Sequence, residues 1–109
     1  MSYDVSLIGA GKVERIQEGG TQVVGGTDEP ELNITYNYAE VYSLFDFNIN
    51  DLNGRRAALF IEKMEQIVAK CGTKRFENYW APTPGNAGFA LSILLGWAKQ
   101  YPDATWEVS

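Results

Sequence analysis

The clearest fold signals lie in residues 79–101, YWAPTPGNAGFALSILLGWAKQY. Thr83 followed by Pro84 is typical of a helix start, because the threonine hydroxyl accepts a backbone N–H and proline has no N–H to leave without a partner. The helix should end at Tyr101, since Pro102 disfavours helical geometry in the residue before it. Apolar residues at helical spacing predict the side that faces the core: Ala87, Leu91, Leu94, Leu95 and Ala98.

Three small residues of this helix, Gly88, Ser92 and Gly96, lie four positions apart. A glycine inside a helix costs roughly 1 kcal/mol relative to alanine, so we expect these positions to let another backbone approach closely. On this interpretation, replacing Gly96 with leucine destabilises the protein by overpacking.

The rest of the chain predicts strands, a second helix and a last strand. Alternation and turn residues indicate a first strand at 3–8 that ends at Gly9, a hairpin with strands at 13–16 and 21–24 around a turn at 17–20, and a strand over 31–38. A helix should begin at Asp51 or Asn53, continue to Lys70 and stop at Gly72, and residues 104–109 should form a strand beside the first. Residues 39–47 fit either a helical turn or an irregular link.

These elements predict one compact domain over residues 1–109, of the α+β class. We expect a mainly antiparallel sheet of about four strands, two principal helices packed on one face, and a C-terminal strand. In the strand at 31–38, the period of two places Leu32, Ile34, Tyr36 and Tyr38 on the core face.

Composition excludes several classes of site. The chain has one cysteine, Cys71, and no histidine, so it has no internal disulfide, no thiolate metal site and no histidine base. Residues 46–51, DFNIND, resemble a calcium loop but lack its glycine and its final glutamate. We therefore assign no metal, cofactor or catalytic residue. Cys71 falls on the apolar side of its helix and is predicted to be an inert core thiol.

Charge and hydropathy limit the partners. The net charge of −5 argues against nucleic acid, which requires clustered Lys and Arg. Asp28, Glu29 and Glu31 cluster, and we interpret them as a solvated acidic turn rather than as a mimic of DNA. No apolar run approaches the ~20 residues that span a bilayer, and the N-terminus has no signal-peptide pattern. We expect no membrane partner and a location in the cytoplasm.

Two segments carry candidate binding residues. At the start of the second helix, Tyr79 and Trp80 offer flat apolar surface, while Gly85 and Asn86 beyond Thr83 offer backbone N–H groups that attract anions. In the strand, the polar face opposite the core consists of Asn33, Thr35 and Asn37. Alternatively, this face is solvated, Thr83 only caps its own helix, and both aromatic residues belong to the core.

Two motifs are distinctive together, residues 33–38 (NITYNY) and residues 79–87 (YWxxTxGNA), and a YPDxxW ending follows them. This pattern resembles a group of small phage and prophage proteins of unassigned function, over most of the chain from Gly25 onward. The resemblance implies a viral or prophage origin, and it implies that the two motifs meet in space.

Two functions follow from these observations. In the first, a small anionic ligand, for example a nucleotide-like one, binds in one pocket, and the protein sequesters a host defence signal without catalysis. That pocket would consist of Asn33, Thr35, Asn37, Tyr79, Trp80, Thr83, Gly85 and Asn86. In the second, the protein is an interaction module that inhibits a host enzyme or assists phage assembly, and the aromatic residues are its contact anchors. An enzyme ranks third.

Overall fold

The computed structural model describes residues 1–13 and 30–109 in full, and the backbone of residues 17–18 and 21–25 between them. The strands are β1 (Ser2–Ile8), β2 (Gln17–Glu18), β3 (Thr21–Gly25), β4 (Pro30–Thr35) and β5 (Thr105–Val108). The α-helices are α1 (Ala39–Ser43), α2 (Ile61–Cys71) and α3 (Pro84–Gln100). Three short 3₁₀ helices complete the described elements: η1 (Tyr36–Tyr38), η2 (Ile49–Leu52) and η3 (Ala57–Phe60). The α+β class predicted from the sequence is confirmed.

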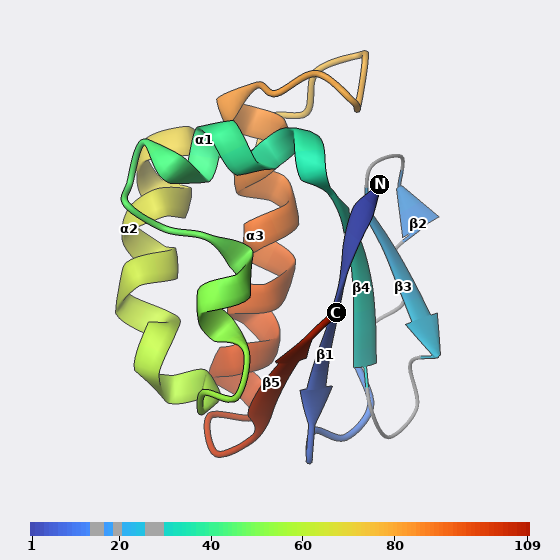
Figure 1. Cartoon of the computed structure of the whole chain (residues 1–109), viewed down its shortest axis with the longest axis vertical. Helices are drawn as coiled ribbons and strands as arrows, with labels where there is room; N and C mark the ends of the chain where they lie inside the picture. Colours follow the sequence, from blue (N-terminus) through green and yellow to red (C-terminus); the bar gives the residue numbers. More distant parts are fainter. Residues whose placement is uncertain (14–16, 19–20, 26–29) are drawn as a thin grey trace.

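The strands form one antiparallel sheet in the order β2-β3-β4-β1-β5 (Figure 1). The C-terminal strand pairs with β1 as predicted, with Leu7 opposite Trp106. The sheet has five strands rather than about four, and Gln17 and Glu18, expected in a turn, pair with β3 as strand β2. Residues 14–16 of the predicted strand, and Asp28 and Glu29 of the acidic turn, lie outside the described residues.

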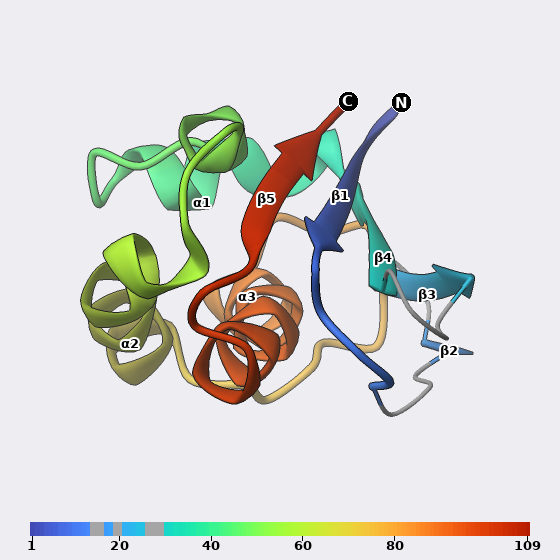
Figure 2. The ribbon, with the colours of Figure 1, turned by 90° about the horizontal axis from the view of Figure 1, so that it is seen from below.

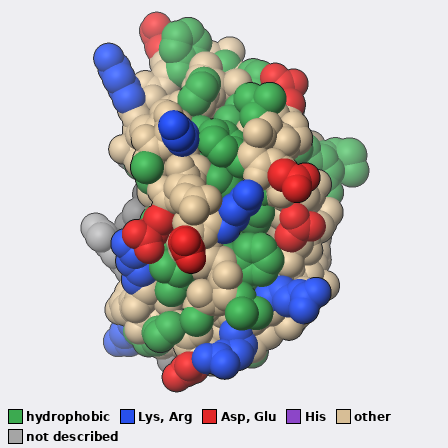
Figure 3. All heavy atoms as spheres, turned by 90° about the vertical axis from the view of Figure 1, so that its left-hand side faces the viewer, with side chains coloured by type: hydrophobic (Ala, Val, Ile, Leu, Met, Phe, Trp, Pro, Cys, Tyr) green, Lys and Arg blue, Asp and Glu red, His purple; other side chains and the backbone are tan. Residues whose placement is uncertain are grey.

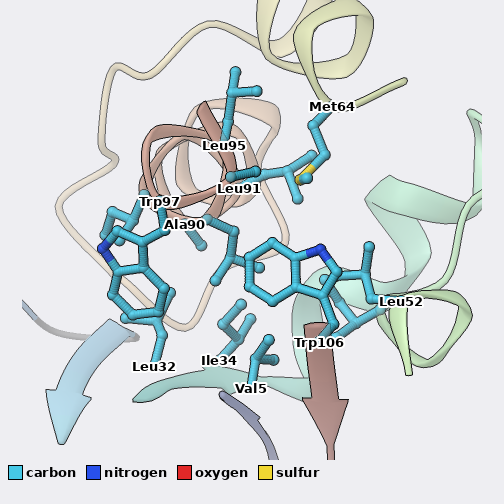
Figure 4. Packing of buried hydrophobic residues seen from close by; sticks show 14 of the residues in the cluster. Val5, Leu32, Ile34, Leu52, Met64, Ala90, Leu91, Leu95, Trp97 and Trp106 are labelled. Carbon is cyan, nitrogen blue, oxygen red and sulfur yellow. The ribbon is translucent and has the colours of Figure 1, made fainter. Parts of the chain in front are cut away.

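The helices cover one face of the sheet, as the view from below makes clear (Figure 2). Figure 4 shows the core between these layers, where Trp106 of β5 lies near Val5 and Leu52, and Trp97 of α3 lies near Leu32. The five α3 residues predicted to face the core are all buried. Among the described residues, no helix has both the length and the apolar character that crossing a bilayer requires.

The helix ends follow the predicted signals. The Thr83 Oγ1 accepts the N–H of Asn86 at 3.2 Å, and Pro84 is the first residue of α3. Gly72 ends α2 with a φ of +72°, and its N–H donates to the Val68 carbonyl at 2.8 Å. These two caps fix where the connection between α2 and α3 begins and ends.

The strand predicted over 31–38 is too long. It ends at Thr35, whose Oγ1 accepts the N–H of Asn37 at 3.3 Å and so starts η1. The backbone therefore leaves the period of two, and Tyr36 is 40% exposed while Tyr38 is buried. Tyr36 was wrongly assigned to the core.

The helix predicted to start at Asp51 or Asn53 begins only at Ile61. The residues before it run along the outer edge of β5 instead. The Trp106 N–H donates to the Arg55 carbonyl, and the Gly54 N–H donates to the Trp106 carbonyl, both at 2.9 Å. Asp51 lies inside the short η2, whose N-cap is Asn48, and its carboxylate accepts the Asn48 N–H. Pairing with the open edge of the sheet has replaced helical hydrogen bonds in this segment.

The small residues of α3, Gly88, Ser92 and Gly96, do not share one packing contact. A Cβ on Gly88 would overlap the carbonyl oxygen of Gly72, so the close approach predicted for Gly88 is present. Gly96 is exposed, and a Cβ there would have nothing within 4 Å, so the prediction for Gly96 is wrong. Positions four apart in a helix of 3.6 residues per turn drift by about 40° at each step, which carries Gly96 away from the contact.

Replacing Gly96 with alanine is therefore expected to stabilise the protein by about 0.5 to 1 kcal/mol, because alanine restricts the unfolded chain and fits an open helix position. A thermal melt of both proteins checks this. A lower melting temperature for G96A would contradict the open environment of this residue.

Candidate functional site

The two sequence motifs meet at one end of the molecule. The Asn37 Nδ2 donates to the Trp80 carbonyl at 3.0 Å, and the Tyr38 hydroxyl donates to the Tyr79 carbonyl at 2.6 Å. Figure 1 shows the segment before α3 at the same end as α1 and the N-terminus. Residues more than 40 positions apart in the sequence thus hold each other in place.

Asn86 holds the connection between α2 and α3 together from inside. Its side chain is buried, and its Oδ1 accepts the N–H of Phe76 at 2.9 Å. Its Nδ2 donates to the carbonyls of Asn78 and Ala81, at 3.1 and 3.0 Å. Both N–H donors of the amide are therefore used within the protein. Asn86 acts as a structural clamp on residues 76–81 in this arrangement.

The start of α3 offers little to an anion. Pro84 has no N–H, and the N–H groups of Asn86 and Ala87 bond to the side chain and carbonyl of Thr83. The carbonyl of Lys74 lies against the Cα of Gly85, where a Cβ would overlap it. A carbonyl oxygen carries partial negative charge, so its presence here opposes an anion rather than attracting one.

The remaining polar candidates also bond within the protein. Asn33 lies on the sheet face away from the helices, where its Nδ2 donates to Ser2 Oγ at 2.6 Å and to Asp4 Oδ1 at 2.9 Å. Thr35 caps η1 through its hydroxyl. The structure therefore brings Asn37 to Tyr79 and Trp80, but it separates Asn33 from the buried Asn86.

Aromatic side chains are the exposed groups that remain. Trp80 is 55% exposed, and its ring packs on that of Tyr79 with centroids 4.0 Å apart and the ring planes tilted by 34°. Tyr36 and Phe76 are also exposed, and the ring of Tyr36 contacts Tyr3 edge to face at 4.5 Å. We call the surface formed by Tyr36, Phe76, Tyr79 and Trp80 the aromatic end.

Sequence reasoning missed Tyr36 and Phe76 as surface residues. Phe76 stands between charged residues in the polar segment 73–78, which was a signal that it lies outside the core. Tyr36 follows Thr35, a residue type that caps short helices, and this was a signal that the strand ends there.

Burial favours the neutral, protonated form of two titratable groups near the candidate site, the Tyr38 hydroxyl and the Cys71 thiol. Burial raises the pKa of the Tyr38 hydroxyl, so it remains a hydrogen-bond donor to Tyr79 at neutral pH. Burial likewise raises the pKa of the Cys71 thiol, which keeps it in the neutral, weakly nucleophilic form. Cys71 is partly buried and packs against the core, on the apolar side of α2 where it was predicted.

Within the part of the chain that the structure describes, no three His, Cys, Asp or Glu side chains are placed to share a metal ion. In the segment that resembles a calcium loop, the Asp51 Oδ2 accepts the N–H of Asn48 at 3.0 Å. This carboxylate caps η2.

Comparisons of the chain with protein-family models, with curated proteins and with solved structures give no match.

Proposed function

We propose that this protein is a phage or prophage accessory protein that binds another protein through the aromatic end. The observation that supports this most is Trp80, whose side chain is 55% exposed although its backbone is fixed on both sides. Its carbonyl accepts from Asn37, and its N–H donates to the Asn78 Oδ1 at 3.0 Å. A large aromatic side chain on a fixed backbone loses little freedom on binding, and tryptophan and tyrosine commonly dominate interface energy.

The proposed partner is a host protein with an apolar pocket for Trp80. The proposed phage origin is supported only by the resemblance of the motifs at 33–38 and 79–87 to small phage and prophage proteins. Occupying the pocket of a host enzyme would inhibit that enzyme.

A small anionic ligand has less support than a protein partner. Asn33, Thr35 and Asn86 are bonded within the protein, and the carbonyl of Lys74 faces Gly85. One face of the Trp80 ring already packs on Tyr79, which leaves less aromatic surface for a base. The remaining flat, apolar surface suits a side-chain pocket of another protein better than a phosphate.

Site-specific photocrosslinking in bacterial cells tests this function. A benzophenone amino acid in place of Phe76, which is 56% exposed and leaves Trp80 intact, should give one discrete protein adduct. The matched control places the same group at Leu44, which is more exposed, at 81%, and lies outside the aromatic end. The control should give no such adduct. The proposal fails if position 76 gives no protein adduct, or if the purified protein releases a nucleotide or another small anion on denaturation.

A further inference from the structure

A second surface feature, separate from the aromatic end, is an open hollow between η2 and η3. It has a volume of about 570 Å³ and is lined by Asn50, Asp51, Asn53, Arg55, Leu59 and Phe60. Figure 3 looks onto the side of the molecule that carries α2, where apolar side chains lie between charged side chains of both signs.

Two opposite charges line this hollow without pairing. Among the described residues, Arg55 and Asp51 form no ion pair, either with each other or with another side chain. Asp51 is fixed by its Oδ2, which accepts the Asn48 N–H at 3.0 Å, and its other oxygen is not engaged by this bond. The backbone of Arg55 is fixed by its bonds to Leu52 and Trp106. Both charges are thus available to a ligand.

The rest of the lining supplies amide donors and an apolar wall. The Asn53 Oδ1 accepts the Val108 N–H at 3.0 Å, which leaves its Nδ2 donors for a ligand. Leu59 is 65% exposed, and Phe60 beside it is partly exposed. An exposed leucine next to a hollow gains from contact with an apolar group.

We propose that this hollow binds a free amino acid with a large apolar side chain. The carboxylate of the ligand pairs with Arg55, its ammonium group pairs with Asp51, and its side chain packs on Leu59 and Phe60. A dianion such as phosphate is repelled by Asp51, and a simple cation is repelled by Arg55. A zwitterion satisfies both charges.

Two-dimensional NMR with three probes tests the charge requirement on the unmodified protein. L-phenylalanine has both charges, N-acetyl-L-phenylalanine has only the carboxylate, and L-phenylalaninamide has only the ammonium group. We expect L-phenylalanine to give saturable shifts at residues 50–55 and 59–60, and the other two probes to bind at least about tenfold more weakly. Equal binding of all three, or no saturable shift up to about 10 mM L-phenylalanine, would overturn the proposal.

A pair of adjacent arginines supplies the matched variants. Arg55→Gln should reduce the affinity for L-phenylalanine at least about tenfold, since it removes the charge and keeps a polar group of similar length. Arg56 is outside the lining and pairs with Asp103 at 3.1 Å, so Arg56→Gln should leave the affinity within about twofold. Unchanged resonances elsewhere confirm that each variant is folded. An equal loss in both variants would contradict the assigned role of Arg55.

Discussion

Replacing Gly88 with alanine is expected to lower the free energy of unfolding by about 2 to 3 kcal/mol. The added Cβ would overlap the carbonyl oxygen of Gly72 and would lie 3.0 Å from the Cβ of Cys71. Gly72 has little room to move, because it ends α2 at a φ of +72° and its N–H is bonded to Val68. The overlap is with backbone, so rotation of a side chain cannot relieve it.

Urea denaturation measures this effect as a lower transition midpoint with an unchanged slope. Gly96→Ala is the matched control, because it makes the same chemical change in the same helix at an open position. The two variants should shift the midpoint in opposite directions. If both stabilise the protein, the close approach of Gly72 to α3 is wrong.

The second large effect is expected from Asn86→Ala, at about 2 kcal/mol of lost stability. The substitution removes three hydrogen bonds and leaves the Phe76 N–H and the carbonyls of Asn78 and Ala81 without this partner. Hydrogen exchange at the Phe76 amide should become faster than in the unmodified protein, because the connection from 76 to 81 is no longer clamped.

Asn37→Ala is the control for Asn86→Ala. Asn37 is exposed and its side chain makes one bond, to the Trp80 carbonyl, so its loss should cost less than about 0.5 kcal/mol. Equal, small effects of the two substitutions would show that Asn86 is not a structural clamp, and would restore its amide as a candidate ligand-binding group.

Local signals were sufficient to predict α3. Thr83, Pro84 and Pro102 act on their immediate neighbours, and the apolar period is a property of one helix, so the sequence contains all the information for its ends and its buried side. The roles of Gly88 and Gly96 depend on where Gly72 lies in space. No local pattern distinguishes these two glycines.

Sheet pairing explains the largest error in the predicted elements. Residues 55–57 have side chains that suit a helix, but the open edge of β5 offers the backbone of residues 54–57 carbonyl and N–H partners. Such pairing depends on a strand that follows about 50 residues later in the chain, at 105–108. The helix propensity of a short segment takes no account of hydrogen bonds to a strand that is distant in the sequence.

The sequence was sufficient to predict which two segments form the candidate site, but not which of their polar side chains are free to bind a ligand. The contact of Asn37 and Tyr38 with residues 79–80 agrees with the expectation that the two motifs meet. Whether an asparagine faces a ligand or bonds within the protein depends on tertiary partners, as the buried amide of Asn86 illustrates. Sequence alone gives the residue type, and the structure assigns its hydrogen bonds.

The central claim is that binding depends on Trp80, and the affinity of the purified, crosslinked partner tests it most directly. Trp80→Ala should weaken binding at least about tenfold, because tryptophan is a common anchor of interfaces and this one is exposed on a fixed backbone. Leu44→Ala removes an even more exposed apolar side chain elsewhere and should leave the dissociation constant within about twofold. A dissociation constant that is unchanged by Trp80→Ala, in a variant of unchanged stability, would contradict the account.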